Sequence, residues 1–459
     1  MDDKNNLNKI SGFSDRFSNE LGISNKLDYE FFNFTKLWGY ERIDTPIIEK
    51  SSIFSRKTGS SIGSNIYNFR DPSGLDVSLR PDFTPSIMRL FLENRNNSNE
   101  VRYSYSGEIY RYASSNNKNF SRQNGVELIG NNNLFSDLEI IAMSKIFLEK
   151  ILNEEIKISI GHVGILQEVI KSFELSDRVA LFILQNIDQI RTNYSEDTII
   201  IKAEESGIVF LEESFEIKEI QNQDFSLLLK SAFNSDSNFE QTRDKDSIIS
   251  GMINKFSSST SREKFLQCIS IINKLVNINL NLEESISEAN LVLKNISVKN
   301  KLKNLYDLTS NLSHYDIDQS EIFIDYGLVR EWGYYTGFVF NLTNSNNDIL
   351  GGGGRYDSVG NSLGEKLSAA GFAVDSEKII HSKNLSFEVP KSKKVIIYID
   401  DQNDLNDAID TCKKERSKGN IVSLNSSFAN LEELKLWSSK NEISEVIFFE
   451  NNKINRSKI

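Results

Sequence analysis

Cysteine, histidine and proline are scarce in this chain of 459 residues, which contains 2, 3 and 5 of them. Cys268 and Cys412 stand far apart in segments with helical periodicity, so they predict neither a disulfide framework nor a metal cluster. His162, His314 and His381 have no cysteine or carboxylate at metal-ligand spacing. We therefore expect no metal and no cofactor, and structural roles for the three histidines.

Long hydrophobic runs and a basic excess are also missing. No window approaches the ~18 uncharged apolar residues of a membrane span, and the start, MDDKNNLNKISGF, has no apolar signal segment. These absences predict a cytoplasmic protein with no membrane partner. The net charge of −12 opposes a polyanion, so it disfavours nucleic acid and favours a small molecule or a protein as partner.

The length predicts two or three domains, and composition and periodicity divide the chain further. Short strand-like segments and helices fill 1–165, whereas 166–315 has no proline and repeated helical periodicity. Strand patterns return in 316–389, and strands alternate with helices in 390–459. The predicted class is α+β: an antiparallel sheet flanked by helices (1–165 and 316–389), a helical insertion (166–315) and a small C-terminal α/β domain (390–459).

Three local patterns predict the shape of the first sheet. Apolar residues at helical spacing from Leu27 to Leu37 predict a helix that Gly39 ends. The turn sequence DPSG at Asp71 predicts a hairpin between the strands before and after it. The segment IFIDYGLVREWGYYTGFVFNL, residues 322–342, alternates apolar residues around turn points and predicts a second hairpin.

The segment LRPDFTP, residues 79–85, ends a predicted strand against two prolines and presents Asp82 and Thr84 at a rigid turn. A carboxylate and a hydroxyl at such a turn suit binding of an ammonium group. The alternative is a carboxylate that caps the helix SIMRLFLEN, which follows directly.

The segment GEIYRYASSNNKNFSRQNGVELIG, residues 107–130, predicts two strands joined by a polar loop. Gln123 and Glu127 are an even number of residues apart, so they and Arg111 can share one face of the hairpin. A guanidinium can hold a carboxylate or phosphate, and a carboxylate can hold an amino group or an imidazole N–H. The alternative is a solvated strand face.

Two later segments add aromatic residues and glycines. Arg330, Tyr334 and Tyr335 flank the bend in YGLVREWGYYTGFVF, where aromatic residues could equally be core. LGGGGRYDSVG, residues 350–360, lacks the G-K-[ST] ending of a phosphate loop. Its glycines instead predict close approach of backbone to neighbouring groups.

Together these segments resemble the histidyl-tRNA synthetase family of class II synthetase-like proteins, from about residue 10 to 385. WGYERIDTPIIE is similar to the family's first motif, whose last proline, here Pro46, lies in a dimer interface. YRY with RQNGVELIG is similar to the second motif, LVREWGYYTG to the histidine-specific arginine loop, and GGRYD matches as it stands. The resemblance implies a class II synthetase-like fold with a homodimer core.

The resemblance also implies a histidine pocket. In it Asp82 and Thr84 hold the α-amino group with support from Gln123, while Glu127 and Tyr335 read the imidazole. Arg111 faces the carboxylate or an α-phosphate, and Arg330 stands where active enzymes stabilise charge during adenylate formation. The full set of implied histidine-binding residues is Asp82, Phe83, Thr84, Arg111, Gln123, Glu127, Arg330, Tyr334 and Tyr335.

The chain departs from the synthetase pattern where that pattern serves ATP. Ala113 replaces the glutamate of the second motif, Lys378 replaces the arginine of the third, and Gly333 replaces an aspartate. Lysine lacks the planar fork of arginine, and the loss of one preorganised donor costs on the order of 10²–10³ in rate. We therefore expect an inactive synthetase-like site with no catalytic residues.

LRPDFTPSIMR and IGHVGIL resemble the regulatory subunits of ATP phosphoribosyltransferase more than the synthetases. That resemblance implies a partner, the short-form catalytic subunit, within a hetero-oligomer that histidine inhibits at the first step of L-histidine biosynthesis. Two alternatives stay open. The segment 391–459 resembles a reduced anticodon-binding module and keeps a histidine–tRNA ligase possible, and a paralogue that only binds a partner or an amino acid is the other.

Overall fold

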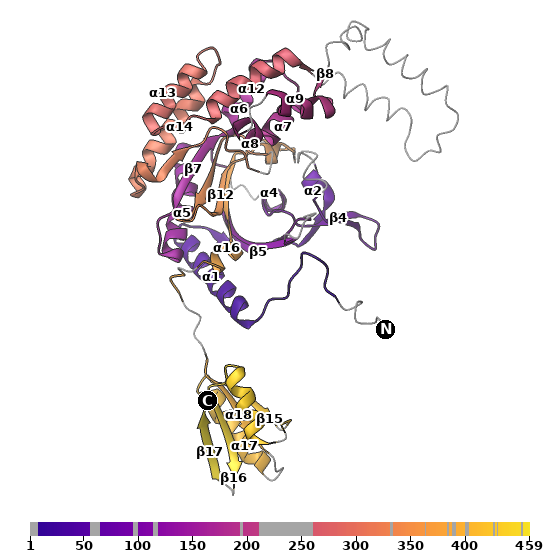
Figure 1. The fold of residues 1–459 in the computed structure, drawn as a ribbon, viewed down its shortest axis with the longest axis vertical. Coiled ribbons are helices and arrows are strands. Elements are labelled where there is room, and N and C mark those ends of the chain that lie inside the picture. Colours follow the sequence, from indigo (N-terminus) through magenta and orange to yellow (C-terminus); the bar gives the residue numbers. More distant parts are fainter. Residues whose placement is uncertain are drawn as a thin grey trace, which may run out of the picture. The chain divides into compact units, whose positions relative to one another are not determined.

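The computed structural model describes residues 8–55, 65–94, 100–112, 118–192, 196–210, 260–330, 334–362, 364–382, 385–387, 392–399, 404–425, 427–428, 430–450 and 453–459. The chain divides into two compact units, Met1–Phe387 and Glu388–Ile459 (Figure 1). Several features named above lie outside the described residues: Ala113 with most of its polar loop, the middle of the helical insertion at 211–259, Gly333 and Pro390.

A mixed sheet organises the first unit. Its inner neighbours run antiparallel, while the short edge strands β1 and β10 run parallel to β5 and β7. The predicted α+β class with a helix-flanked sheet is confirmed, and the sheet differs from the prediction in having two parallel edges. In the described part of the chain the order is β1 (Glu41–Arg42), β5 (Val101–Tyr110), β6 (Phe120–Ile129), β13 (Ala369–Asp375), β12 (Ile349–Arg355), β11 (Phe338–Thr343), β7 (Lys157–His162) and β10 (Ile322–Ile324).

The predicted hairpin at 322–342 is wrong. β10 and β11 both form, but β7 lies between them and pairs with each: Ile322 lies opposite Ile158 in the parallel pair, and Phe340 opposite Ile160 in the antiparallel pair. Apolar alternation identifies a strand without identifying its partner. The parallel pair needs a long crossover, and the helical insertion between β7 and β10 provides it.

The predicted first helix and first hairpin are confirmed. α1 (Ser18–Leu37) ends just before Gly39, whose φ of +83° lies in the left-handed region that glycine adopts readily. Asp71 accepts hydrogen bonds from the backbone N–H groups of Ser73 and Leu75 in the turn. That turn joins β3 and β4 of a small second sheet, whose strands are, in spatial order, β2 (Ile48–Lys50), β4 (Asp76–Leu79) and β3 (Asn68–Arg70).

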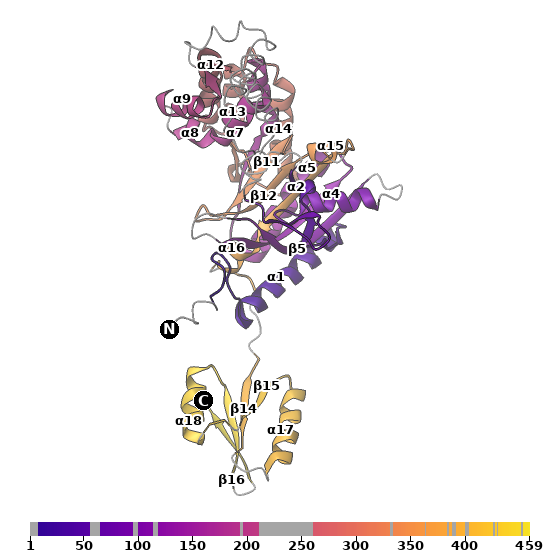
Figure 2. The same ribbon diagram turned by 90° about the vertical axis from the view of Figure 1, so that its right-hand side faces the viewer.

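Each face of the main sheet packs against its own helices. α1 and α5 (Leu134–Leu152) cover one face, where Phe31, Phe147 and Phe372 meet edge-on with ring centroids 5.1–6.4 Å apart (Figures 1 and 2). The opposite face packs against α4 (Thr84–Glu93) through a second cluster that includes Phe83 and Tyr105. Among the described residues of this part there are also three short helices: α2 (Ser51–Ser55), α15 (Ser358–Ser362) and α16 (Ser376–Ile380).

The helices of the predicted insertion gather at one end of the first unit (Figures 1 and 2). They share a continuous hydrophobic cluster with the sheet, because Leu305 and Ile269 belong to the same cluster as Ile158 of β7. The elements are α6 (Val163–Ser172), α7 (Asp177–Gln185), α8 (Ile187–Thr192), α9 (Glu196–Glu205), β8 (Val209–Phe210), β9 (Thr260–Ser261), α12 (Arg262–Val276), α13 (Leu282–Val292), α14 (Lys299–Asn311) and the 3-10 turns Leu312–Tyr315 and Gln319–Glu321.

The second unit is a small α/β fold with a helix on each face of its sheet (Figure 2). Alternate residues of its central strand separate the two cores, since Val395 and Ile397 pack with α17 and Ile396 packs with α18. Its strands are, in spatial order, β15 (Ile421–Asn425), β14 (Lys394–Tyr398), β16 (Glu445–Glu450) and β17 (Lys453–Lys458), and its helices are α17 (Leu405–Ser417) and α18 (Leu431–Lys440).

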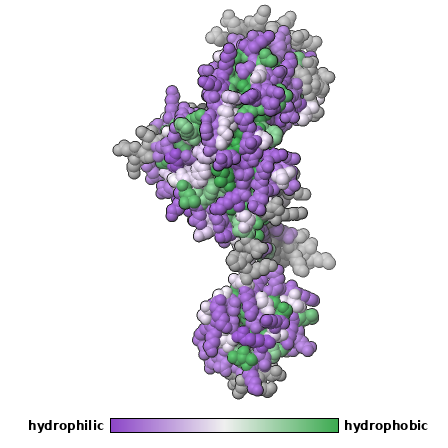
Figure 3. All heavy atoms as spheres, turned by 90° about the vertical axis from the view of Figure 1, so that its left-hand side faces the viewer, coloured by the Kyte–Doolittle hydropathy of each residue, from purple (hydrophilic) through white to green (hydrophobic). Residues whose placement is uncertain are grey.

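On the face that Figure 3 shows, the surface is mostly hydrophilic and carries smaller hydrophobic patches. Among the described residues, none of the helices combines the length and the apolar character needed to cross a bilayer.

The contacts of Phe31 with Phe147 and Phe372 generate a prediction for stability. Phe31 is fully buried, so Phe31→Ala should lower the free energy of unfolding by about 3–5 kcal/mol through lost burial and the cavity left behind. Tyr29 lies on the same helix with 60% of its surface exposed, so Tyr29→Ala should change it by less than ~0.5 kcal/mol. Urea denaturation followed by circular dichroism measures both, and equal effects would contradict the proposed packing role of Phe31.

Candidate functional site

One face of the β5–β6 hairpin forms the wall of a cavity. Gly107 lies opposite Gln123 and Tyr103 opposite Glu127, so the alternation of the strands points Gln123, Glu127 and Arg111 toward the same side. This is the face away from α1 and α5, since Val126 and Leu128 point into the core on the other side. The shared face expected from sequence is therefore present.

The cavity has a volume of about 370 Å³, the size of a small-ligand site. Eight of the nine predicted site residues line it: Asp82, Thr84, Arg111, Gln123, Glu127, Arg330, Tyr334 and Tyr335. The ninth, Phe83, is fully buried behind the wall, where its ring stacks on Tyr105 at 4.2 Å and lies 3.6 Å from the Arg80 guanidinium. The structure thus brings together side chains from segments that are far apart in the sequence.

Asp82 is held at the turn between β4 and α4. Its Oδ2 accepts a hydrogen bond from the Tyr334 hydroxyl at 2.7 Å, and its Oδ1 lies 3.4 Å from the Thr84 backbone N–H. The carboxylate therefore makes a long contact with the first turn of α4 as well as facing the cavity. Burial raises the pKa of Asp82, while nearby Arg111 opposes that rise.

Glu127 is the most enclosed acid of the cavity, with 2% of its surface exposed. Thr84 Oγ1 donates to its Oε1 at 2.7 Å, and the Tyr356 hydroxyl donates to its Oε2. Burial raises the pKa of Glu127 to about 8, although these hydroxyl donors favour the ionised form. At neutral pH the carboxyl group therefore carries a proton for most of the time.

Three tyrosines form an aromatic wall beside this acid. Tyr334 and Tyr335 have ring centroids 4.9 Å apart, and Tyr356 meets Tyr334 edge-on at 5.6 Å. Burial raises the pKa of all three hydroxyls, so they stay protonated and can donate or accept hydrogen bonds. Such a wall suits a planar ring that carries polar atoms at its edge.

Two arginines also line the cavity. Arg111 Nε donates to the Pro81 carbonyl at 2.9 Å, and Arg330 Nη1 donates to Asn341 Oδ1 at 2.5 Å and to the Phe340 carbonyl at 3.2 Å. Gln123 Oε1 is buried and accepts no hydrogen bond from the described residues. A buried oxygen without a donor is costly, so this amide is a natural contact for a ligand.

Glycines on the central strands leave room for these side chains, as the sequence predicts for LGGGGRYDSVG. A Cβ at Gly352 would lie 2.2 Å from Arg330 Nη1, and one at Gly354 would lie 3.0 Å from the Tyr335 ring. On neighbouring strands, Gly371 leaves space for Glu127 and Gly125 for the Tyr105 ring.

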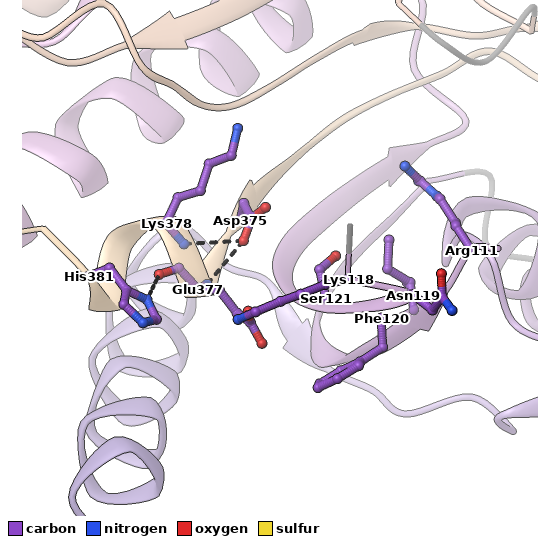
Figure 4. Close-up of a pocket in the computed structure, with 10 residues that line it drawn as sticks. Arg111, Lys118, Asn119, Phe120, Ser121, Asp375, Glu377, Lys378 and His381 are labelled. Carbon is purple, nitrogen blue, oxygen red and sulfur yellow. Dashed lines mark hydrogen bonds and ion pairs between the residues drawn. The ribbon is translucent and has the colours of Figure 1, made fainter. Parts of the chain in front are cut away.

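A second cavity of about 520 Å³ adjoins the first and shares Arg111, Asp375 and Lys378 with it. Lys118 reaches across to form an ion pair with Glu377 on α16 (Figure 4). Lys378 points away from Glu377, and its Nζ donates to the Ile349 carbonyl at 2.8 Å. This cavity thus carries two carboxylates, Asp375 and Glu377, beside its basic groups.

Several lining residues were not singled out by sequence reasoning. Tyr356 lies within the GGRYD motif, and its bond to Glu127 becomes evident only when β12 and β6 are placed two strands apart. Tyr105 had a signal in the alternation of β5, since it precedes Gly107 by two residues. No sequence pattern pointed to Asn341, whose Oδ1 accepts a hydrogen bond from Arg330.

The described residues contain no group of three histidine, cysteine or carboxylate side chains able to hold a metal. Both cysteines are buried as free thiols, and burial raises the pKa of Cys268 to about 12, which makes that thiol inert at neutral pH. His381 lines the second cavity, with Nδ1 2.7 Å from the Glu377 carbonyl.

The buried acid generates a prediction for stability against pH. Glu127 has a pKa of about 8 in the folded chain and an ordinary value of 4.5, so only the folded chain keeps this proton between those values. The contribution of the buried Glu127 carboxyl group to the free energy of unfolding is complete below pH 4.5 and is lost as pH rises through 8. Glu127→Gln should therefore flatten the fall in unfolding free energy between pH 5 and 8, a change of the order of a few kcal/mol.

Urea denaturation at several pH values measures this effect. Glu288→Gln, on an exposed part of α13, is the matched control and should leave the pH profile unchanged. A wild-type profile that is already flat would refute the assignment of the proton to Glu127.

Two histidine–tRNA ligases are similar to this chain over most of its length. The histidine–tRNA ligase of Sulfurisphaera tokodaii is 27% identical over 425 residues, covering 91% of this chain and 84% of that protein. The histidine–tRNA ligase of Saccharolobus solfataricus is 26% identical over 388 residues, covering 83% and 77%.

Solved structures show the same fold. A Bacillus halodurans protein described as an ATP phosphoribosyltransferase regulatory subunit/histidyl-tRNA synthetase matches with a TM-score of 0.67 and 21% identity, covering 96% of this chain and 98% of that one. The histidyl-tRNA synthetase of Nostoc sp. PCC 7120 matches with a TM-score of 0.61 and 14% identity, covering 98% and 94%.

A family model described as histidyl-tRNA synthetase matches residues 12–191 and 252–379. These ranges make up well over half of the chain and include every residue of the first cavity named above. The chain therefore belongs to the histidyl-tRNA synthetase family.

Proposed function

We propose that this chain is a regulatory subunit of ATP phosphoribosyltransferase. It binds the short-form catalytic subunit, is required for its activity and makes it sensitive to L-histidine at the first step of histidine biosynthesis. The observation that carries this proposal is the contrast between the two adjoining cavities. The first is lined by carboxyl, hydroxyl and guanidinium groups that suit an amino acid. In the second, the lysines are engaged with other groups and two carboxylates oppose a polyphosphate.

The first cavity matches the polar groups of histidine. Asp82 and Thr84 offer oxygen atoms to an α-ammonium group, and Arg111 offers a guanidinium to a carboxylate. Glu127 and the tyrosines offer carboxyl and hydroxyl groups beside aromatic faces, which suits a ring with polar edges. Gln123, whose buried Oε1 accepts no hydrogen bond from the residues that the structure describes, supplies a further contact.

The second cavity is a poor site for ATP. Adenylate formation needs several fixed cations around the phosphates, because the transition state carries concentrated negative charge. Lys118 is engaged with Glu377, and Lys378 is turned to a backbone carbonyl. The carboxylates of Asp375 and Glu377 would repel phosphate oxygens unless a bound cation intervened.

Feedback inhibition by histidine then requires only that histidine binds two states of the assembly with unequal affinity. If histidine binds the inactive state of the assembly more tightly than the active state, it shifts the population by that difference in affinity. A coupling of ~1–3 kcal/mol changes activity by about 5–150-fold.

The second candidate function is histidine–tRNA ligase. Two observations favour it: the named relatives align over as much as 91% of this chain, and the chain carries a separate α/β unit at 388–459. In that case the nucleotide contacts would differ from the family pattern.

A mixing experiment distinguishes the two functions. We expect the purified chain to activate a short-form ATP phosphoribosyltransferase subunit in the formation of phosphoribosyl-ATP, and histidine to suppress that activation. We expect no histidine-dependent ATP–pyrophosphate exchange by the chain alone. Robust exchange together with no effect on the transferase would overturn the proposal in favour of the ligase.

A substitution at the ammonium site tests the ligand. Asp82→Asn keeps the shape and removes the charge, so histidine affinity measured by calorimetry should fall about 10–100-fold. Feedback should weaken in parallel while activation without histidine is kept. Asp76→Asn, an exposed carboxylate on β4, is the matched control, and equal affinities for the two variants would contradict the assignment.

A further inference from the structure

The segment 11–16 precedes α1 and lies against the end of the β5–β6 hairpin, where Arg111 and Asn119 are bonded neighbours. We propose that this segment is a clamp that fixes that end of the hairpin and thereby positions Arg111 for an anionic group in the first cavity. The part of the proposal that concerns a ligand rests on the histidine-binding role proposed above. The part that concerns the hairpin does not.

Asn119 is the residue at which the clamp joins the hairpin. Its backbone N–H donates to the Gly12 carbonyl at 2.9 Å, and its Nδ2 donates to the Ser11 carbonyl at 3.0 Å. In turn, the Asn119 carbonyl accepts a hydrogen bond from the Arg111 N–H at 2.9 Å. Asn119 is 5% exposed, so losing these bonds without a substitute is costly. A displacement of Gly12 is therefore passed to the backbone of Arg111.

Gly12 and Asn119 approach each other so closely that only glycine fits at position 12. The φ of Gly12 is +83°, in the left-handed region, and a Cβ there would lie 2.3 Å from Asn119 Nδ2 and 2.5 Å from Asn119 Cγ. The short, buried Asn119 side chain has little room to move aside. A larger residue at position 12 would therefore push the clamp and the hairpin apart.

Two side chains of the clamp hold both strands of the hairpin. Phe13 stacks on Phe120 of β6, with ring centroids 5.8 Å and ring planes 9° apart, and its centroid lies 6.1 Å from that of Tyr67. Arg16 Nη2 donates to Glu108 Oε1 of β5 at 2.7 Å, and the Arg16 guanidinium lies over the same Phe120 ring at 5.8 Å. The clamp thus bridges β5 and β6 where their pairing ends.

Arg111 is the residue through which the clamp can affect a ligand. Its guanidinium lines both cavities, and Figure 4 shows it beside Asn119 at this end of the hairpin. The Arg111 side chain is fixed at Nε by the Pro81 carbonyl, at 2.9 Å, and its backbone is fixed by Asn119. A guanidinium binds a carboxylate best when both groups are aligned, so a shift of the Arg111 backbone weakens this contact more than the other contacts of the cavity.

Hydrogen exchange tests the hold on the hairpin without any ligand. In Gly12→Ala and in Phe13→Ala, the amide hydrogens of Arg111 and Asn119 should exchange about tenfold faster than in the natural chain, as measured by mass spectrometry with fragmentation to single residues. Gly39→Ala is the matched control: Gly39 has the same φ of +83°, and a Cβ there would have nothing within 4 Å. Exchange no faster than in this control overturns the clamp.

Two ligands distinguish positioning of Arg111 from a general loss of structure. L-histidine carries a carboxylate, and the corresponding amino alcohol carries a hydroxymethyl group in its place. By calorimetry, Gly12→Ala and Phe13→Ala should bind histidine about tenfold more weakly than the natural chain, and should bind the amino alcohol within about twofold of it.

Arg111→Gln should show the same difference between the two ligands. Phe13→Ala added to Arg111→Gln should weaken histidine binding by no more than about twofold further, because both changes act on one contact. Ile10→Ala, at a position that is 73% exposed just before the clamp, is the second control and should match the natural chain.

The outcomes separate this proposal from the histidine site. Equal losses of affinity for histidine and for the amino alcohol would make the clamp a general stabilising contact and overturn its positioning role. If the natural chain binds no histidine, the histidine site is refuted, and hydrogen exchange decides the clamp by itself: faster exchange supports it, and unchanged exchange overturns it.

Discussion

Close approach at four glycines is the constraint on which the site depends. Gly125, Gly352, Gly354 and Gly371 lie on adjoining strands at the centre of the main sheet, and a Cβ at each would meet a wall side chain of the first cavity. At Gly371 the clash would be with Glu127 Oε2, 2.0 Å away. A sheet surface is normally filled by its own side chains, so a hollow large enough for an amino acid requires their removal.

The same constraint explains why the buried acid is tolerated. Glu127 lies flat against backbone at Gly371, which leaves both of its oxygens pointing at hydroxyl donors from Thr84 and Tyr356. Those two residues come from segments on opposite sides of β6 in the sequence. A buried carboxyl group without partners is costly, and here the fold supplies its hydrogen bonds through these two hydroxyl groups.

Much of the candidate site could be predicted from the sequence, because the alternation of side chains along a strand depends only on residues close together in the chain. The even spacing of Gln123 and Glu127 placed them on one face, and the glycine run at 351–354 predicted close approach, which the structure confirms. Strand partners are not local, and the expected 322–342 hairpin failed because both strands pair with β7. Tyr356 was missed for the same reason, since its contact crosses between strands that are not neighbours.

The position of β7 has a consequence for synthesis of the chain. Lys157–His162 leaves the ribosome before the helical insertion, and both of its partners, β10 and β11, follow that insertion. At ordinary rates of translation this strand waits on the order of ten seconds or more with both edges unsatisfied. An exposed apolar strand is prone to pairing with other chains. The nascent protein therefore depends on the helices made in that interval, of which α14 packs on β7, to shield one face of the strand.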